Sequence, residues 1–387
     1  MKRQNRLHLI IYIVALVMVS GQLLVGCSST SALKEGEQLF TGLNPIDYRN
    51  YEPGDYADSA KEEMEYALAS APNGALFGSS YYRTPFPVRL WIWNAFSQSK
   101  GGLAKWITKT FGSKPKLMAN VNPQLRAQVA EHQLDKYGYF NGKVTYDVLT
   151  ESNPKKAKVA YHVDLGHLWT LDSMAYLNFP VKGKQLIDST MKKAIIKKGS
   201  PFNVSNLELE RQRITRLFRN NGYYFYQNGY ASYLADTVSV PGKAQVRLTM
   251  VDSIEPEATR QWYIGNININ FKKDFMEEMT DSFVRRYLSF RYHGKKMPIR
   301  PGVVLRNLRI RPRTLYKVRT EERAKSGLQE MGLFNYTSLQ FTPRSTKSVD
   351  SLGNVVYNDT LDANIDLVFD KPYDFYIEAN ARGKTSG

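Results

Sequence analysis

The chain has 387 residues, more than one hydrophobic core comfortably spans, so we expect two to four domains. Its formal net charge of +17 suggests an anionic partner, which could be nucleic acid, a membrane surface or an acidic protein. A single cysteine excludes an intrachain disulfide and a cysteine-based zinc site.

The N-terminal residues have the three parts of an export signal. Basic residues precede an apolar run over residues 9–19, which is short for a spanning helix, and Gly26 stands directly before Cys27. The only cysteine therefore lies where a bacterial lipoprotein signal places its lipidated residue. We predict a signal peptide over residues 1–26, cleavage after Gly26 and stable anchoring by acyl chains on Cys27. An uncleaved membrane anchor is the alternative.

Two further expectations follow from this signal. No Asp follows Cys27, which in such signals indicates the outer membrane. Export also excludes nucleic acid as the anionic partner. Residues 27–36 are predicted to be a polar tether, and a first strand is expected to carry Leu39, Leu43 and Ile46.

The next helix is predicted over residues 59–71, with Ser59 as its N-cap and Glu62 completing a capping box. Residues 72–120 then form an irregular insertion with seven basic residues, no acid and many aromatic residues. Aromatic rings among basic residues suit a membrane interface, and Trp91, Trp93 and Trp106 are the candidates for it. The alternative is that these rings pack beneath a loop.

A short signature then occurs three times, each time closing a helix and opening a strand. Its glycine stands where a helix C-cap needs positive φ, and the next residue can fold back onto the last turn. Asn122-Pro123 is the predicted start of the first such helix. The three copies read Lys136-Tyr137-Gly138-Tyr139-Phe140, Asn221-Gly222-Tyr223-Tyr224 and Met331-Gly332-Leu333-Phe334.

Each preceding helix is predicted to bury one apolar stripe. The stripes comprise Leu125 and Val129; Leu207, Ile214 and Leu217; and Ala324, Leu328 and Met331. Two alternating strands follow every copy, and the first strand of each pair is a candidate sheet edge. The candidate edge residues are Val144, Tyr146 and Val148; Ala231 and Tyr233; and Leu339 and Phe341.

The second repeat is predicted to begin with a strand in residues 168–177 and a helix over residues 184–198. Its long second helix should start with a capping box from Ser205 to Glu208. In the third repeat we expect an insertion at residues 272–297 and a short helix over residues 301–308, with Tyr316 in the place of Phe202. The basic residues between 299 and 319 form either a solvated face or a contact with lipid or a partner domain.

No motif for catalysis is present. The sequence has no phosphate-binding glycine loop, dinucleotide fingerprint, His-Glu-x-x-His or nucleophile elbow. His162 and His167 are expected to face opposite sides, and Glu277 and Glu278 are expected to point apart on a helix. We therefore predict no catalytic residues, no metal site, no cofactor and no enzymatic activity.

The order strand, helix, helix, strand, strand, repeated in an exported chain, resembles the POTRA domain. The glycine-aromatic step at Gly138, Gly222 and Gly332 is the most recognisable part of that resemblance. It implies an α+β fold with about three tandem POTRA-like domains, over residues 37–166, 167–256 and 257–371. The whole chain resembles the periplasmic half of a BamA/TamA-type outer-membrane assembly factor, and its signal and the Trp91-Ile92-Trp93 insertion resemble the lipidated TamA-like branch.

This resemblance implies a periplasm-facing scaffold that receives unfolded outer-membrane proteins or accessory subunits, by β-augmentation at sheet edges. Neighbouring repeats covering those edges are the alternative at any one of them. Residues 372–387 alternate like the first strand of a transmembrane barrel, so we expect the chain to be a piece of a longer protein rather than a free-standing tethered module. The alternative function is an adaptor that links envelope components, lipids or a TamB-like partner without handling clients.

Overall fold

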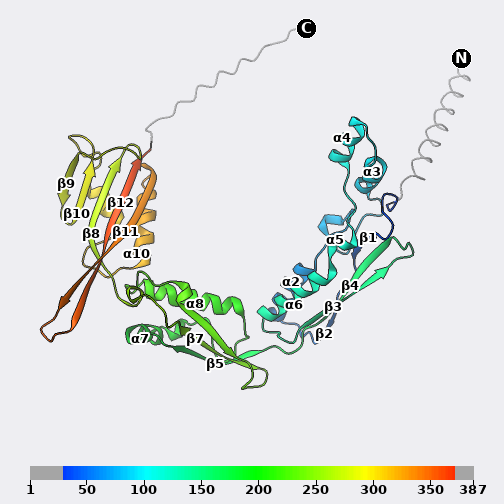
Figure 1. Cartoon of the computed structure of the whole chain (residues 1–387), viewed down its shortest axis with the longest axis horizontal. Helices are drawn as coiled ribbons and strands as arrows, with labels where there is room; N and C mark the ends of the chain where they lie inside the picture. Colours follow the sequence, from blue (N-terminus) through cyan, green and yellow to red (C-terminus); the bar gives the residue numbers. More distant parts are fainter. Residues whose placement is uncertain (1–28, 371–387) are drawn as a thin grey trace, which may run out of the picture. The chain divides into compact units, whose positions relative to one another are not determined.

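The computed structural model describes residues 29–370 (Figure 1). The predicted cleavage at Gly26, the lipidation of Cys27 and the barrel strand at residues 372–387 lie outside this range. The chain divides into two compact units. The first comprises the described residues up to Asp172 with Lys198–Ser205 and Asp236–Gln245, and the second comprises the rest. Among the described helices, none combines the length and apolarity that crossing a bilayer requires.

The first sheet is built around β4 (Lys156–Asp164). Two short strands, β1 (Leu39–Leu43) and β2 (Asp47–Arg49), pair with it in parallel, and β3 (Lys143–Thr150) pairs antiparallel on the other side. Helices α2 (Asp55–Leu68) and α6 (Pro123–Lys136) pack on each other. The core between helices and sheet contains Phe40, Met64, Leu68, Ala130, Leu134, Val159 and Tyr161.

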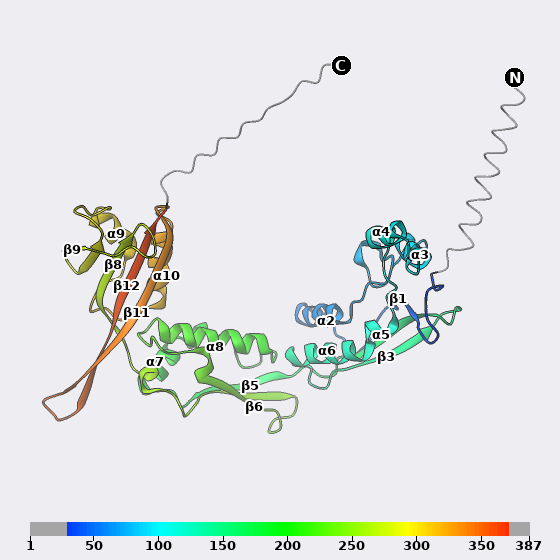
Figure 2. The ribbon, with the colours of Figure 1, turned by 45° about the horizontal axis from the view of Figure 1, so that its top comes forward.

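The predicted insertion between α2 and α6 is largely helical. It contains the short turn η1 (Leu76–Gly78) and the helices α3 (Val88–Phe96), α4 (Gly102–Phe111) and α5 (Met118–Val121). Figures 1 and 2 show α3 and α4 away from α2 and α6, while Leu90 of α3 packs with Leu39 of β1.

The second sheet has the order β5-β7-β6. Its strands are β5 (Thr170–Leu177), β6 (Ala231–Asp236) and β7 (Lys243–Met250). Between β5 and β6 lie α7 (Val181–Ser189), η2 (Met191–Lys193), α8 (Val204–Arg219) and η3 (Asn228–Tyr230). The helices and the sheet enclose a core rich in aromatic residues, with Tyr176, Ile214, Phe218, Tyr223, Tyr226 and Leu248.

The third sheet has five strands in the order β11-β12-β8-β10-β9. They are β8 (Tyr263–Lys272), β9 (Asp281–Arg285), β10 (Leu288–Tyr292), β11 (Phe334–Val349) and β12 (Val355–Phe369). The turn η4 (Pro256–Thr259) precedes β8, and α9 (Pro301–Leu308) and α10 (Val318–Gln329) precede β11. The core between the third sheet and its helices includes Trp262, Ile267, Phe271, Leu328, Ile365 and Leu367.

The three sheets share one topology. Apart from the additional strands β2, β9 and β10 and the helices of the insertion, the order in each is strand, helix, helix, strand, strand, and the last strand lies between the first and the penultimate one. Figure 2 shows α6 above β3 and α8 above the β5–β6 sheet, so each long helix covers one face. The chain is therefore an α+β protein with several sheets, as the sequence predicted.

Several local predictions are wrong. Helix α2 starts at Asp55, so Ser59 lies inside it, where its hydroxyl donates to the Asp55 carbonyl. Helix α8 starts at Val204, so Ser205 is within its first turn. The helix predicted over residues 184–198 ends at Ser189, because the chain turns there to let the Ile195 amide donate to the buried Glu210 carboxylate at 2.9 Å.

The stripe of the first long helix is also wrong. Leu125 and Val129 of α6 face solvent, and the buried positions are the small residues Ala127 and Ala130 together with Leu134. Small side chains let α6 approach α2 closely. Residues 272–297 interrupt the repeat between β8 and α9, as expected of an insertion, and they add β9 and β10 to the third sheet. Glu277 and Glu278 lie in a loop instead of the predicted helix.

Candidate functional site

The strands that follow the three signatures are β3, β6 and β11, and each is an edge strand of its sheet. An edge strand leaves every second backbone amide and carbonyl without a partner in its own sheet, which makes it a template for another extended chain. The residues predicted at these edges lie on these strands. These residues differ in how far they are buried against the helices of their sheet.

The most open edge is β3. Only Val144 on it is buried, and the remaining residues are exposed on both faces. Tyr146 pairs with Tyr161 and Val148 with Val159 across the ladder, so all four share one face of the sheet. Because the β4 partners are fully buried and the β3 residues are not, the apolar face continues outward onto the free edge.

On the other two edge strands, some of the predicted residues already pack or form hydrogen bonds within this chain. On β6, Ala231 is buried, and the Tyr233 hydroxyl donates to the Leu207 carbonyl at 2.7 Å. On β11, Leu339 is buried, and Phe341 packs on the third core. The start of β11 is touched by the ring of Phe275, 5.0 Å from that of Tyr336.

The three signature glycines all have positive φ: 85° at Gly138, 94° at Gly222 and 63° at Gly332. In the first two copies, the residue after glycine turns into its own core: Tyr139 and Tyr223 are buried there. In the third, Leu333 is exposed, and Phe334 packs on Phe271 and Phe369.

Within the first compact unit, Gly138 is one end of a ladder of backbone hydrogen bonds that we call the first joint. Its carbonyl accepts from the Trp169 amide at 2.9 Å, and the Trp169 carbonyl accepts from the Phe202 amide at 2.8 Å. Leu171 continues the ladder, exchanging hydrogen bonds with Ser200 and Gly199. The ring of Phe140 packs on those of Trp169 and Phe202, with centroids 5.6 and 4.9 Å away. The second aromatic of the signature therefore belongs to the joint.

Tyr56 closes the first joint from α2. Its hydroxyl donates toward the carbonyls of Tyr137 (2.9 Å) and Phe202 (3.2 Å), and it accepts from the Asn203 amide group. Burial raises the pKa of Tyr56 to about 12.

Within the second compact unit, Gly222 is the end of a second joint with the same hydrogen bonds. The Gly222 carbonyl accepts from the Trp262 amide at 2.8 Å, and the Trp262 carbonyl accepts from the Tyr316 amide at 2.9 Å. Ile264 then exchanges hydrogen bonds with Thr314 and Arg313, as Leu171 does in the first joint. The rings that fill this joint are Tyr224, Phe225, Trp262, Tyr316 and Phe341.

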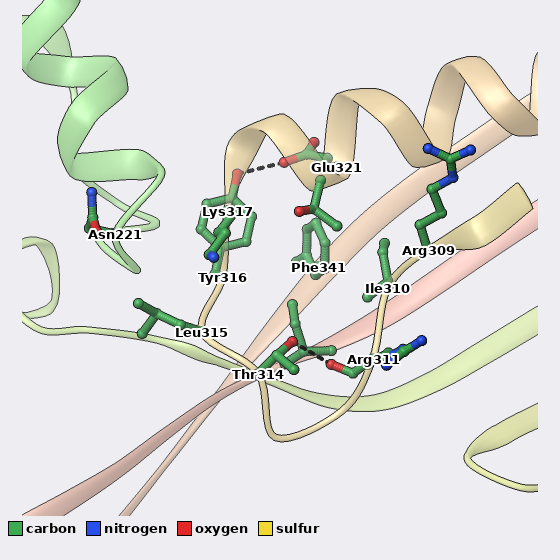
Figure 3. Close-up of a pocket in the computed structure, with 12 residues that line it drawn as sticks. Asn221, Arg309, Ile310, Arg311, Thr314, Leu315, Tyr316, Lys317, Glu321 and Phe341 are labelled. Atoms are coloured by element: carbon green, nitrogen blue, oxygen red, sulfur yellow. Dashed lines mark hydrogen bonds between the residues drawn. The ribbon is translucent and has the colours of Figure 1, made fainter.

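Figure 3 shows the side of the second joint that faces a cavity of about 350 Å³. Tyr316 lies before α10, and its hydroxyl donates to Glu321 at 2.6 Å while it accepts from Arg219 at 3.1 Å. Burial, followed by the Glu321 hydrogen bond, raises the pKa of Tyr316 far above its usual value. The tyrosine is therefore a neutral structural group, held from both sides of the joint.

Sequence reasoning paired Tyr316 with Phe202 but missed Trp169 and Trp262. The signal was available: each tryptophan stands two residues before the aliphatic residue that continues the ladder, in Trp169-Thr170-Leu171 and Trp262-Tyr263-Ile264.

The remaining predicted residues show no catalytic constellation. His162 lies between Asp47 (3.4 Å) and Asp147 (3.2 Å) on the surface of the first sheet, and His167 is near the Gly242 carbonyl instead. In residues 29–370, no three His, Cys, Asp or Glu side chains are placed to hold a metal ion. The three predicted interface tryptophans differ: Trp91 and Trp93 are half-buried on α3, and Trp106 is exposed on α4.

Neither a family model nor a curated protein matches the chain. Among solved structures, it is similar to POTRA domains 3–5 of BamA from Haemophilus influenzae, at 12% identity over 87% of this chain and 99% of that one, with a TM-score of 0.35. It is also similar to POTRA domains 1–3 of Omp85 from Anabaena, at 11% identity over 88% and 98% of the two chains, with a TM-score of 0.27. The function proposed for this chain rests on its own geometry.

Proposed function

We propose that this chain is the POTRA arm of an outer-membrane assembly factor, a non-enzymatic scaffold that binds unfolded outer-membrane proteins or accessory subunits along its sheet edges. The observation that carries the proposal is the placement of the edges. In each of three sheets with one topology, the strand after the signature is an edge strand. Of these, β3 is apolar on one face and open on both.

β-Augmentation makes physical sense for such a partner. The main-chain hydrogen bonds of an added strand are independent of its sequence, so one edge can accept many clients. Tyr146 and Val148 supply an apolar surface for every second side chain of the added strand. A barrel strand alternates apolar and polar residues, so one register covers both positions with apolar side chains.

The localisation proposed with this function is the periplasmic face of the outer membrane, with acylated Cys27 as anchor. The lipoprotein pattern at Gly26-Cys27 supports it. The TamA-like branch, with a TamB-like partner, is the proposed subfamily.

Hydrogen exchange on β3 tests the binding mode. The full chain is mixed with a urea-denatured outer-membrane barrel protein diluted into buffer, and amide exchange is followed residue by residue. Outward amides of an edge strand alternate with amides bonded to β4, so augmentation should slow exchange at every second residue from Thr145 to Thr150. The Val144 amide already donates to Glu131 at 2.9 Å, so it should not respond. The amides of the central strand β4 serve as the internal control and should not change.

Proline variants at adjacent positions sharpen the test. Asp147→Pro and Val148→Pro each remove one amide, and only one of the two amides faces outward. The variant that lacks the outward amide should lose client binding while keeping the thermal stability of the protein, whereas alanine at the same position should retain binding. Client binding that persists in both prolines, or protection without alternation, would favour the adaptor function.

A further inference from the structure

Helix α4 directs its apolar face to solvent. Leu103 and Trp106, three residues apart on one face, are 72% and 56% exposed, and Phe111 at the end of the helix is 49% exposed. The buried residue of this helix is Thr108, on the opposite side. An amphipathic helix of a water-soluble domain has the reverse arrangement. The exposed face of α4 therefore suits contact with an apolar environment outside this chain.

Further apolar side chains are exposed in the same insertion. Phe77, at the tip of η1, has its ring fully exposed and a left-handed backbone with φ 50°, a conformation that an aromatic residue rarely adopts. The other exposed apolar residues of the same insertion are Leu76, Tyr82, Phe86, Val88 and Phe96.

The charges around this face are all positive. Residues 72–120 contain seven basic residues and no acidic one. Lys105 and Lys109 flank the apolar stripe of α4, both exposed, and no ion pair is found for either among residues 29–370. In contrast, Arg83 pairs with Glu151 at 3.9 Å, at the base of the insertion.

The start of the described chain lies against the same insertion. Leu33 is buried together with Leu90 of α3 and Leu39 of β1. Ser29 and Thr30 line a cavity with Arg83, Pro85, Pro87 and Trp91. In the sequence, Cys27 is only two residues before Ser29, which lines this cavity. The predicted tether is thus partly packed and leads directly to the insertion.

We propose that α4 and the η1 tip form a surface that binds an anionic lipid bilayer, with Leu103, Trp106 and Phe77 at the level of the headgroups and Lys105 and Lys109 on lipid phosphates. Aromatic and aliphatic side chains flanked by lysine are the composition of helices that lie in a membrane interface. The position of Ser29 beside the insertion makes the surface a second attachment next to the acyl anchor, and in this respect the inference rests on the proposed lipidation of Cys27. Two attachments hold a protein on a membrane more firmly than one.

Quenching of Trp106 by brominated lipids tests this surface. The full-length protein is reconstituted into vesicles of phosphatidylcholine, with or without phosphatidylglycerol, whose acyl chains carry bromine. The difference in fluorescence between the unchanged protein and Trp106→Phe is the emission of Trp106, which we call the Trp106 component. In vesicles with phosphatidylglycerol we expect bromine to remove more than half of this component, and iodide in the water to quench it several-fold less than in detergent.

The charge part is tested by Lys105→Gln/Lys109→Gln, which should lower the bromine quenching of Trp106 at least two-fold in the same vesicles. The matched control is Lys192→Gln/Lys193→Gln, an exposed lysine pair on η2, which should leave it unchanged. A Trp106 component that bromine leaves intact and iodide still quenches would overturn the proposal, and so would equal quenching in the two lysine variants. The mass of the N-terminal peptide reports acylation of Cys27 separately, so failure of the anchor is distinguished from failure of the surface.

Discussion

Replacing the three signature glycines by alanine should separate the two roles that these residues have. All three have positive φ, but only two are in a joint. A Cβ at Gly138 would lie 2.6 Å from the Phe202 carbonyl oxygen, and one at Gly222 would lie 2.6 Å from the end of the Leu315 side chain. At Gly332 a Cβ would meet no heavy atom within 4 Å. Gly332→Ala is therefore a matched control for backbone strain alone.

The expected costs follow from these contacts. A left-handed backbone costs an alanine about 1–2 kcal/mol, which is the whole expected effect at Gly332. At Gly138 the added methyl group meets backbone, which cannot rotate away, so the joint must open and lose hydrogen bonds worth about 1 kcal/mol each. With a further cost of about 1–3 kcal/mol for overpacking, we expect Gly138→Ala to destabilise the first joint by about 3 kcal/mol or more. Gly222→Ala should cost less, because Leu315 can change rotamer.

Native-state hydrogen exchange of the tryptophan amides measures each joint by itself. Selective 15N labelling of tryptophan gives five backbone amides, and those of Trp169 and Trp262 donate to the two signature carbonyls. A loss of about 3 kcal/mol corresponds to faster exchange by a factor on the order of 100. Gly138→Ala should produce it at Trp169 and leave Trp262 unchanged. Equal effects of Gly138→Ala and Gly332→Ala at Trp169 would refute the reasoning.

Three other substitutions have defined outcomes. Glu210→Gln should lower the free energy of unfolding, measured in urea, by about 3–5 kcal/mol, because the buried carboxylate accepts hydrogen bonds from Arg213 at 2.6 and 2.8 Å. The control Glu322→Gln, which breaks an exposed ion pair with Arg216, should cost at most about 1 kcal/mol. Similar losses in the two variants would contradict this reasoning. Tyr56 has a folded-state pKa of about 12, above its usual value, so its stabilisation is complete below pH 10 and disappears as pH rises toward 12. Tyr56→Phe should therefore make the thermal midpoint less dependent on pH in this range, and an unchanged pH profile would show that other groups control it. Asn122→Ala should cost about 2 kcal/mol, because it removes the cap on the Leu125 amide and places alanine on a left-handed backbone. Asn122→Gly should cost less, because glycine adopts the positive φ without strain.

The repeat could be predicted from the sequence because its signals are local. A glycine that caps a helix and an alternating strand depend on residues a few positions apart, and Gly138, Gly222 and Gly332 adopt the expected φ. Asn122 caps α6 for the same reason. These features depend on residues that are close together in the sequence.

The errors occur where a distant residue decides the outcome. The helix predicted to reach Lys198 ends early because the carboxylate of Glu210, on another helix, takes the Ile195 amide. The stripe of Leu125 and Val129 is apolar, yet the buried face of α6, which packs on α2, is the one with Ala127, Ala130 and Leu134 in the core. Hydrophobicity alone favours the larger residues, while close packing of two helices favours the smaller ones.

The same distinction applies to the candidate site. The edges could be inferred from strand order, since a strand that follows the helices and precedes the central strand lies outermost in this topology. The spacing of Trp169 and Trp262 from the aliphatic residue that follows marks both joints, but their partners could not be inferred, because 32 residues separate Trp169 from Phe202 in the sequence. Only the comparison of two joints shows that Trp169 and Trp262 have equivalent partners.

The first two copies of the signature thus link the core of one repeat to the joint that follows it. Glycine ends the helix and leaves its carbonyl free, the next aromatic fills the core behind it, and the one after that fills the joint ahead. The strand that starts a few residues later is oriented by both contacts, because Tyr139 and Phe140 fix the chain from opposite sides just before β3. The glycine-aromatic step therefore fixes where β3 begins, while the outer edge of that strand is left without a partner in its own sheet.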